Sequence, residues 1–437
     1  MGRLRMPGDK SISHRAAIIA AMARGQTRIA NFSTSADCAS TLSCLKELGV
    51  KIERQSTQVT IDGVGLDGFR EPRGALDCGN SGSTMRMLAG VLASQDFVSE
   101  LTGDAALCSR PMNRIVEPLT MMGARIESTD GHAPLRIIGS GMLKPISYVM
   151  PVASAQVKTC ILLAGLCADG RTEVIEAWNS TRDHTERMLK WFGVPVLRNE
   201  VRHDNPHLGS ISVTGASRLK ARNGVVPGDM SAATFFVAAA AALPGSALTI
   251  HEVGLNPTRA TIVDTLCELG VDALAIPNFY RLTSVDFNEP FGDIEVTGNP
   301  RFVPNQRGRS NALSGKRIPK LIDELPMMAV LGTQFPDGLT IRDAAELRVK
   351  ETDRIAATVQ NLRAMGAEVE EHDDGMTIKG RVKLSGAKIN SYGDHRIAMA
   401  FSIAALIADG ESEIAGVECV SVSCPEFYEL LESVVKR

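Results

Sequence analysis

The distribution of apolar residues predicts a series of buried helices, the first of them close to the N-terminus. Residues 7–15 read PGDKSISHR, and an almost unbroken apolar run, AAIIAAMA, follows them. A helix without a strongly polar face is usually buried. The polar residues stand before the run, where Asp9 or Ser11 can cap the helix. We therefore expect a buried helix whose N-terminus carries Lys10, Ser11 and Arg15.

The same pattern recurs five more times along the chain. VPGDMSAATFFVAAAAALPG, which ends at Gly245, aligns without a gap with MPGDKSISHRAAIIAAMARG, which ends at Gly25, and each glycine is expected to cap the end of its helix. The other copies are GNSGSTMRMLAGVLAS, SAQVKTCILLAGLCADG, DELPMMAVLGTQFPDG and GDHRIAMAFSIAALIADG. The intervals between copies are 71, 75, 74, 95 and 70 residues, counted from Gly8, Gly79, Ser154, Gly228, Asp323 and Gly393.

A second helix follows most copies. TLSCLKELGVKI, VEPLTMMGARI, ERMLKWFGVPV, VDTLCELGVDA and VQNLRAMGAEV each show apolar residues at helical spacing, a glycine stop and then a short strand. PEFYELLESVV is assigned as the sixth. The stretches QVTIDGV, HAPLRIIG, SISVTG, YRLTSV and GMTIKG between them read as strands. The pattern predicts six copies of one α/β unit, three in each half of the chain.

The length of 437 residues predicts two domains, because one core usually splits above roughly 250–300 residues. We place the first domain at residues 9–226 and the second at residues 227–437, together with an N-terminal strand, 1–8. Residues 299–317 are basic, contain Pro and Gly, and lengthen the fourth interval. They are expected to form a surface loop with no assigned role.

Polar residues gather at the N-termini of the apolar helices in both halves. A helix N-terminus carries partial positive charge and can bind anions. At each tip the alternatives are a capped, solvated helix start and an anion site. Because both halves share the pattern, we expect the tips to face one cleft between two domains. The polar tip residues after the first helix are Asn80, Arg86, Ser154, Gln156, Lys158, Asp323, Glu324, His395 and Arg396.

Two further segments are rich in charge. LCSRPMNR at 107–114 carries Arg110, and ELRVKETDRI at 346–355 alternates basic and acidic residues. The second segment reads either as a solvated helix start, capped by Thr352 or Asp353, or as part of an anion site. Arginine binds phosphates and carboxylates in bidentate fashion. These segments therefore suit a substrate that carries both groups.

Composition excludes several classes of function. The net charge of −3, from 47 basic and 50 acidic residues, argues against a general nucleic-acid binder. The apolar run at 232–243 has about half of the ~20 residues that a membrane span needs. Nine cysteines without a C-x-x-C pair indicate reduced thiols in a cytoplasmic protein. Neither a P-loop nor an H-E-x-x-H zinc motif is present.

Nine motifs together resemble the 5-enolpyruvylshikimate-3-phosphate synthase family of enolpyruvyl transferases. The resemblance runs from about residue 7 to SCPEF at 423–427. It implies an α/β fold of two similar domains, each of three βαβαββ repeats about a pseudo-threefold axis, with the active site in the cleft between them. The motifs are GDKSISHR, GNSGSTMR, SRPMNRIVEPL, SAQVK, RDHTERML, PGDMSAATFF, LIDELPMMAV, RVKETDRI and GDHRIAMA.

The resemblance also implies a reaction. The enolpyruvyl group of phosphoenolpyruvate is transferred to the 5-hydroxyl of shikimate 3-phosphate, and phosphate is released through a tetrahedral intermediate, in aromatic amino acid biosynthesis. It implies no metal and no organic cofactor. The expected partners are these two small molecules, with no nucleic acid and no membrane, and the chain is expected to be a cytoplasmic monomer.

The resemblance assigns roles to individual residues. It makes Lys10 the lysine that contacts both substrates, Asp323 the base for the 5-hydroxyl, and Glu351 the group for proton exchange at the methylene carbon. The residues it implies for shikimate 3-phosphate are Lys10, Ser11, Arg15, Ser154, Ala155, Gln156, Arg182, Asp323 and Lys350. The residues it implies for phosphoenolpyruvate are Lys10, Asn80, Gly82, Arg86, Arg110, Gln156, Glu351, Arg354, His395 and Arg396.

Departures from the family pattern leave some points open. Val422 stands where many members carry a basic residue, so the number of cations in the clamp is undecided. Gly82 leaves the pocket of the inhibitor glyphosate open, and tolerance to it is undecided. One alternative is a UDP-N-acetylglucosamine enolpyruvyl transferase, a sister enzyme that carries a reactive Cys several residues before an Arg-Pro. Here Cys108 lies only two residues before Arg110, which disfavours this alternative. The other is a non-catalytic anion-binding paralogue, which the expected catalytic residues disfavour.

Overall fold

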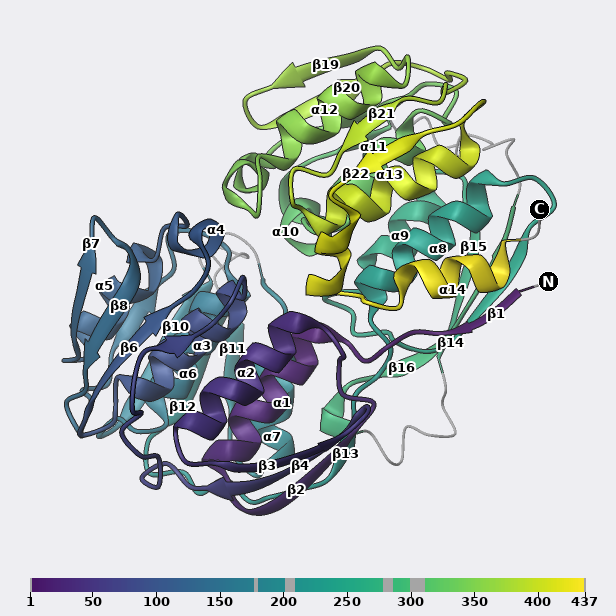
Figure 1. The fold of residues 1–437 in the computed structure, drawn as a ribbon. Helices are drawn as coiled ribbons and strands as arrows, with labels where there is room; N and C mark the ends of the chain where they lie inside the picture. Colours follow the sequence, from purple (N-terminus) through teal and green to yellow (C-terminus); the bar gives the residue numbers. More distant parts are fainter. Residues whose placement is uncertain (1, 177–179, 201–208, 278–285, 299–310, 436–437) are drawn as a thin grey trace. The chain divides into compact units, whose positions relative to one another are not determined.

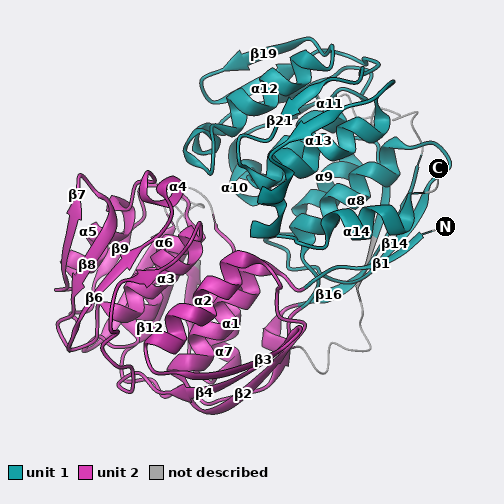
Figure 2. Cartoon of the chain, in the orientation of Figure 1, with its two compact units in different colours: residues 1–7, 227–283, 290–437 teal, residues 8–226, 284–289 magenta. Residues whose placement is uncertain are grey.

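The computed structural model of the chain describes residues 2–176, 180–200, 209–277, 286–298 and 311–435 (Figure 1). It divides into two compact units, coloured separately in Figure 2. Each unit has its own hydrophobic core. Unit 1 comprises residues 1–7, 227–283 and 290–437, and unit 2 comprises residues 8–226 and 284–289. Residues 286–289 thus group with unit 2, although the sequence places them in the second half of the chain.

Unit 2 contains three similar groups of helices and strands in its described residues. The first comprises α1 (Lys10–Met22), β2 (Arg24–Ala30), α2 (Ala36–Glu47), β3 (Lys51–Gln55), β4 (Gln58–Val64) and β13 (Gly224–Val225). The second comprises β5 (Leu76–Asp77), α3 (Gly82–Leu92), β6 (Val98–Thr102), α4 (Ala105–Cys108), α5 (Asn113–Met121), β7 (Arg125–Thr129) and β8 (His132–Ile138). The third comprises β9 (Ser147–Val149), α6 (Ala155–Gly165), β10 (Arg171–Glu176), α7 (His184–Trp191), β11 (Leu197–Glu200) and β12 (Gly209–Thr214).

Unit 1 repeats this arrangement over its described residues. Its first group comprises β1 (Gly2–Arg5), α8 (Met230–Ala242), β14 (Ala247–Gly254), α9 (Thr261–Glu268), β15 (Asp272–Pro277) and β16 (Phe291–Thr297). The second comprises β17 (Ala312–Leu313), α10 (Ile318–Leu321), α11 (Leu325–Gly332), β18 (Leu339–Ile341), α12 (Arg354–Ala364), β19 (Val369–His372) and β20 (Gly375–Ile378). The third comprises β21 (Lys388–Asn390), α13 (His395–Ile407), β22 (Glu413–Ala415) and α14 (Phe427–Val434).

Five sheets in the described residues have four strands and one topology. Their strand orders are β13-β2-β4-β3, β5-β6-β8-β7, β11-β12-β10-β9, β1-β14-β16-β15 and β17-β18-β20-β19. In four of these orders the first strand runs parallel to the second and the other pairings are antiparallel. In β11-β12-β10-β9, which is written from the opposite edge, the parallel pair is β9 and β10. This is the βαβαββ repeat that the sequence predicts. The sixth repeat has a two-stranded parallel sheet in the described residues, β21-β22.

The first strands of two repeats are exchanged along the chain. Strand β1 precedes α1 in sequence but pairs with β14 of unit 1. Strand β13 precedes α8 but pairs with β2 of unit 2. The chain therefore passes between the units at both Pro7 and Val226, so neither unit is one continuous stretch of sequence.

Small residues let the apolar helices pack closely inside each unit. In unit 2, α3 packs against both α1 and α6. A Cβ on Gly90 of α3 would lie 2.2 Å from the carbonyl oxygen of Cys160 in α6, so only glycine permits this approach. In unit 1, α8, α11 and α13 pack on one another, and every residue of α8 is buried. The apolar run at 232–243 is thus a core helix, as predicted.

The second helix of each of five repeats ends as the sequence predicts, at a glycine in the left-handed region. These glycines are Gly49, Gly123, Gly193, Gly270 and Gly366, with φ between 86° and 101°. Residues with a Cβ adopt this conformation at a cost. The same prediction is wrong for the first helices. Gly25 lies inside β2, and α8 is capped by Leu243 before Gly245 is reached.

Two further local predictions, the strand YRLTSV and the loop 299–317, lie wholly or partly outside the described residues. The segment YRLTSV lies outside the described residues, and β16 forms the corresponding strand pairing instead. Residues 299–310 also lie outside the described residues. The remainder of the expected 299–317 loop is partly regular, because β17 pairs with β18 at the sheet edge.

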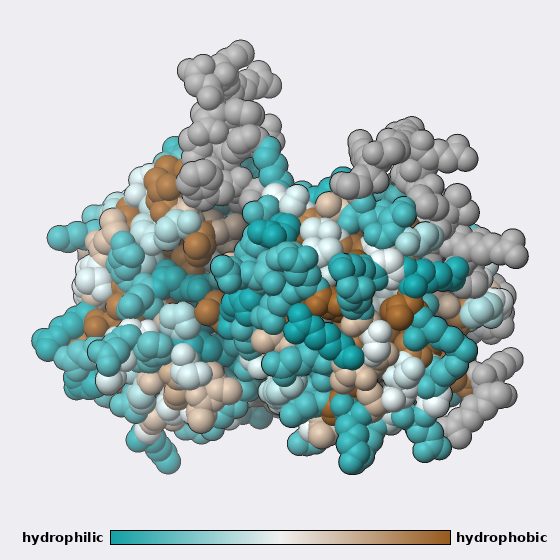
Figure 3. All heavy atoms as spheres, turned by 90° about the horizontal axis from the view of Figure 1, so that it is seen from above, coloured by the Kyte–Doolittle hydropathy of each residue, from teal (hydrophilic) through white to brown (hydrophobic). Residues whose placement is uncertain are grey.

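The surface carries few large apolar side chains. On the face shown in Figure 3, hydrophobic side chains are scattered among hydrophilic ones. Among the described residues, no helix combines the length and apolar character needed to cross a membrane. The apolar residues of the chain therefore serve mainly the two cores.

Candidate active site

Three helix N-termini in unit 2 carry the basic and amide side chains that the sequence singled out. Helices α1, α3 and α6 begin at Lys10, Gly82 and Ala155. Asp9, Ser81 and Ser154 cap them by accepting backbone N–H groups of the first turn. None of these first turns, which all lie in the described residues, contains an acidic residue. The positive ends of α3 and α6 are therefore uncompensated by acids of their own first turn, whereas the carboxylate of the N-cap Asp9 partly offsets the dipole of α1.

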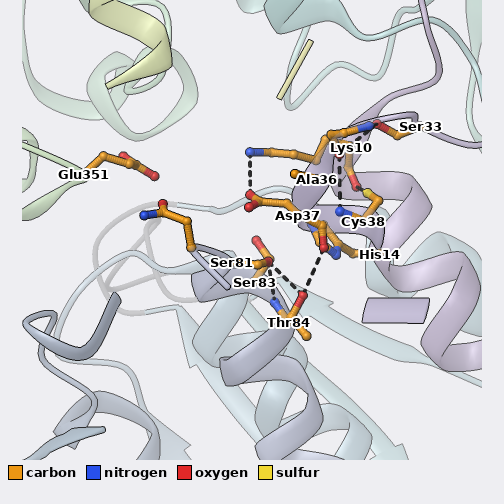
Figure 4. Close-up of polar contacts among 12 residues, drawn as sticks. Lys10, His14, Ser33, Ala36, Asp37, Cys38, Ser81, Ser83, Thr84 and Glu351 are labelled. Carbon is orange, nitrogen blue, oxygen red and sulfur yellow. Dashed lines mark hydrogen bonds and ion pairs between the residues drawn. The ribbon is translucent and has the colours of Figure 1, made fainter. Parts of the chain in front are cut away.

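Lys10 forms an ion pair that the sequence analysis missed. Its Nζ lies 2.9 Å from Oδ2 of Asp37 (Figure 4), and the two side chains are 15% and 9% exposed. Asp37 stands in the first turn of α2, after the N-cap Ser35. An acid there is favoured by the helix dipole in any case. Only the fold brings it to Lys10.

A chain of hydrogen bonds joins α1, α2 and α3. His14 Nδ1 lies 2.7 Å from Thr41 Oγ1, which lies 2.6 Å from Thr84 Oγ1. Thr84 Oγ1 in turn donates to Ser81 Oγ over 2.7 Å. All four side chains are buried, so the chain fixes three helix starts relative to one another.

The buried imidazole of His14 is held neutral. Burial lowers its pKa well below the usual value, and the positive charges of Lys10 and Arg15 lower the pKa further. Its Nε2 has no hydrogen-bond partner among the described residues. A proton on this ring would therefore be both desolvated and repelled.

The low pKa of His14 predicts a loss of stability in mild acid. In the unfolded chain the ring takes up a proton near its ordinary pKa of about 6.5. Below that pH the unfolded state binds more protons than the folded state, so the free energy of unfolding falls until the folded pKa is reached. Urea unfolding at about pH 7.5 and about pH 5.5 should show a smaller drop for His14→Gln than for the parent. Equal drops would contradict the assignment.

Arg15 is a buried cation held by three hydrogen bonds. Its Nε donates to Thr185 Oγ1 over 2.8 Å, and its Nη2 donates to Thr159 Oγ1 over 3.1 Å. Its Nη1 donates to the carbonyl of Ser11 over 2.8 Å. Burial lowers the pKa of Arg15 to about 10, and the nearby charge of Arg182 contributes to this lowering. Arg15 thus stays charged at neutral pH, beside a second cation.

Arg86 and Gln156 connect α3 with α6. Arg86 Nη1 donates to Gln156 Oε1 over 2.7 Å, and Gln156 Nε2 donates to Ser83 Oγ over 2.9 Å. A Cβ on Gly82 would lie 2.6 Å from Arg86 Nη1 and 3.5 Å from Arg110 Nη1. Glycine at this position therefore leaves room for two guanidinium groups.

Arg110 is positioned from the loop that follows α4. Its Nη2 donates to Asn80 Oδ1 over 2.8 Å, and Asn80 Nδ2 donates to Asp104 Oδ2 over 2.8 Å. Asp104 also caps α4 through Leu107 N. Asn80 thereby orients the guanidinium of a buried arginine at the start of α3.

In unit 1, Arg354 forms ion pairs with three carboxylates. Its Nε lies 2.8 Å from Asp394 Oδ2, its Nη2 lies 2.6 Å from Glu351 Oε2, and its Nη1 lies 3.5 Å from Asp323 Oδ1. Burial alone would lower its pKa, but Asp394, Glu351 and Asp323 outweigh burial and raise the pKa. The sequence predicted Arg354, Glu351 and Asp323 for the site but not Asp394.

The three carboxylates on Arg354 differ in exposure. Asp394 is 0% exposed and caps α13 through Arg396 N, whereas Asp323 and Glu351 are each 18% exposed. Asp394 is therefore structural, and the other two can reach a ligand. Lys350 lies in the same cluster, where burial lowers its pKa and the charges of Asp323 and Glu346 oppose that lowering.

The charged segment 346–355 begins α12 with a capped helix start, one of the two alternatives that its sequence allowed. Asp353 caps α12 by accepting Ala356 N over 3.0 Å. Arg348 pairs with Asp353 over 2.7 Å and with Glu371 over 3.1 Å on the accessible side. Arg354, by contrast, is buried. One arginine of this run is thus partly exposed, and the other is buried among carboxylates.

Arg396 lies beside a buried acid that the sequence analysis did not place in the site. Arg396 Nη1 is 3.9 Å from Glu324 Oε1, which accepts Ser231 Oγ over 2.6 Å and Arg259 Nη2 over 3.2 Å. Glu324 is buried, as is the neighbouring His395. Neither Ser231 nor Arg259 was among the residues that the sequence singled out.

The candidate residues therefore form two sets. Unit 1 holds Asp323, Lys350, Glu351, Arg354, His395 and Arg396. Unit 2 holds Lys10, Ser11, Arg15, Asn80, Gly82, Arg86, Arg110, Ser154, Ala155, Gln156 and Arg182.

Metal ligands, cysteine thiols and the remaining tip lysine complete the description of the candidate residues. Across the described part of the chain, no three His, Cys, Asp or Glu side chains are grouped to hold a metal ion. All nine cysteines lie in described residues and are free thiols. Lys158, expected at the tip of α6, is buried and ion-paired inside unit 2.

Comparison with known proteins gives consistent matches over the whole chain. Residues 1–431 match the family model of EPSP synthase (3-phosphoshikimate 1-carboxyvinyltransferase). The chain is 51% identical over 439 residues to the 3-phosphoshikimate 1-carboxyvinyltransferase of Koribacter versatilis, covering 100% of this chain and 97% of the relative. It is 45% identical to the enzyme of the same description from Bacillus licheniformis, with the same coverage.

Solved structures agree. The EPSP synthase of Acinetobacter baumannii matches with a TM-score of 0.81 and 39% identity, covering 99% of this chain and 95% of that one. The enolpyruvyl transferase NikO of Streptomyces tendae matches with a TM-score of 0.77 and 16% identity, covering 99% and 94%. The second likeness shows the fold alone.

Proposed function

The chain belongs to the EPSP synthase family and has 3-phosphoshikimate 1-carboxyvinyltransferase activity, and we propose how its residues divide that reaction. Its substrates are phosphoenolpyruvate and shikimate 3-phosphate. Both are small anions, so the reaction needs cations to hold them and groups that move protons. The observation that carries the proposal is the set of basic and amide side chains near the starts of α1, α3 and α6, namely Lys10, Arg86 and Gln156, of which Arg86 donates to Gln156.

Shikimate 3-phosphate binds mainly to unit 2. Arg15 and Arg182 are two neighbouring cations that favour its phosphate, and Ser154, Ala155 and Gln156 offer the N-terminus of α6. The buried guanidinium of Arg15 is fixed by hydroxyl and carbonyl acceptors rather than by a carboxylate. Its charge thus remains available to a ligand. Lys10 and Ser11 contact the same substrate, and unit 1 contributes Asp323 and Lys350.

Phosphoenolpyruvate binds to the guanidinium groups of Arg86 and Arg110. Amide oxygens of Gln156 and Asn80 orient these groups, and Gly82 leaves the space between them clear. Bidentate binding of phosphate or carboxylate suits such a pair. Lys10 shares this substrate, and unit 1 contributes Glu351, Arg354, His395 and Arg396.

Unit 1 supplies the groups that move protons. Asp323 takes the proton of the 5-hydroxyl while the hydroxyl oxygen bonds to C2 of phosphoenolpyruvate. Glu351 delivers a proton to C3, which gives the tetrahedral intermediate. Glu351 then removes a proton from C3, the bond from C2 to the phosphate oxygen breaks, and phosphate leaves. Lys10 stabilises the negative charge of both substrates throughout.

Neither unit alone carries every group that these steps need. Unit 2 holds Lys10 and four of the proposed arginines, whereas unit 1 holds both of the acids proposed for proton transfer. Because one chain supplies both sets, we propose that the enzyme acts as a monomer. Its free cysteines fit a cytoplasmic location.

An acceptor-competition assay tests the proposal. Phosphate release from phosphoenolpyruvate should occur with shikimate 3-phosphate and stay at background with UDP-N-acetylglucosamine. Turnover with the second acceptor would favour the sister transferase. Binding of both ligands without turnover would favour a non-catalytic paralogue.

A further inference from the structure

A buried lysine links two segments of the proposed shikimate 3-phosphate site without reaching the ligand. Lys158 lies in α6, two residues after Gln156, and its side chain is 1% exposed. Its Nζ lies 3.0 Å from Glu176 Oε1 and 2.6 Å from Glu186 Oε1. Burial would lower the pKa of Lys158, but both glutamates outweigh burial and raise the pKa. The ammonium group is thus permanently charged inside the core.

Glu176 connects Lys158 with the segment that carries Arg182. The same oxygen, Oε1, accepts Thr181 N over 2.8 Å and Thr181 Oγ1 over 2.6 Å. Thr181 is buried and directly precedes Arg182. Three donors on one carboxylate oxygen fix the backbone at this point.

The start of α7 is tied to Arg15 in the same region. Thr185 Oγ1 accepts Arg15 Nε over 2.8 Å and lies 2.6 Å from Thr159 Oγ1 of α6. Thr159 is the residue after Lys158. Arg15 is therefore held by Thr159 and Thr185, which neighbour Lys158 and Glu186 in sequence, whereas the network of Lys158, Glu176 and Thr181 holds the segment that carries Arg182.

We propose that Lys158, acting through Glu176 and Thr181, is a positioning residue that sets Arg182 for the phosphate of shikimate 3-phosphate. This inference rests on the proposed function. It explains why a lysine stands at the fifth position of SAQVK and a glutamate at the fifth position of RDHTE. The two residues are the partners of one ion pair. The network aligns the binding site and takes no part in phosphoenolpyruvate binding or in proton transfer.

The test uses the full-length enzyme and the variant Thr181→Val, which keeps the side-chain size and removes one donor to Glu176. Steady-state kinetics should show a KM for shikimate 3-phosphate raised about tenfold, because a hydrogen bond to a charged group is lost. The KM for phosphoenolpyruvate should stay within about twofold. Thr181→Ser keeps the hydroxyl and should restore the parent value. Thr265→Val removes a similar buried hydroxyl in α9 and should change neither constant.

Two outcomes would overturn the inference. One is a KM for shikimate 3-phosphate that Thr181→Val leaves unchanged, and the other is an equal rise in both KM values. Arg182→Ala separates these failures from failure of the proposed function. If Arg182→Ala weakens shikimate 3-phosphate binding and Thr181→Val does not, only the inference fails. If Arg182→Ala has no effect, both fail. Lys158→Met is less suited, because two buried glutamates would lose their cation and folding itself would suffer.

Discussion

Replacing Lys10 with methionine is expected to lower kcat/KM for phosphoenolpyruvate about a thousandfold, the size typical for loss of a charged group that acts in the transition state. The ammonium group stands at the start of α1, where an anion is already favoured, and methionine keeps the length of the side chain without the charge. Steady-state kinetics with both substrates varied would measure the effect. The melting temperature should change little, because Lys10 is partly exposed and lies outside both hydrophobic cores.

Asp37→Asn is the matched control for this variant. It removes the other half of the ion pair but leaves the lysine charge in place. We therefore expect a much smaller fall in kcat/KM than for Lys10→Met. A Lys10→Met enzyme that keeps its activity while its melting temperature falls steeply would show that Lys10 is structural, and the proposed role would be wrong.

Features encoded by neighbouring residues could be predicted from the sequence. The apolar helices, their capping residues such as Asp9, and the glycine stops such as Gly49 depend on contacts within a few residues. The repeat pattern then predicted six copies of one α/β unit, because the same local signals recur in the same order, and the family resemblance implied the βαβαββ order of its elements. The pairing of β1 with β14 agrees with the expected grouping of residues 1–8 with the second half of the chain, whereas no local signal pointed to the pairing of β13 with β2.

Side-chain partners distant in sequence could not be predicted in this way. Lys10 pairs with Asp37 across 27 positions, and Arg15 bonds Thr185 across 170. Position in a motif gave the type of residue at the site but not its partner. Lys158 shows the consequence. It lies one turn into α6 and looked like a tip residue, but the helix turns it into the core toward Glu176 and Glu186.

Arg354 is expected to be the side chain of unit 1 whose replacement costs most. Arg354→Met would remove the cation that pairs with the fully buried Asp394 and with Asp323 and Glu351. Removing one partner of a buried ion pair typically costs about 3–5 kcal/mol in the free energy of unfolding. Urea unfolding monitored by far-UV circular dichroism would measure this loss in the free energy of unfolding. Activity should disappear as well, because both proton-transfer acids lose their orientation.

Arg348→Met provides the comparison that separates this role from a general effect of charge. Arg348 belongs to the same charged run and also pairs with two carboxylates, but its side chain is 28% exposed against 2% for Arg354. Accessible ion pairs are typically worth at most about 1 kcal/mol. Arg354→Lys should recover only part of the loss, because an ammonium group cannot reproduce a planar fork that reaches three acids. Equal losses for Arg348→Met and Arg354→Met would mean that the cluster is held by the surrounding helices, and that its acids need no buried cation.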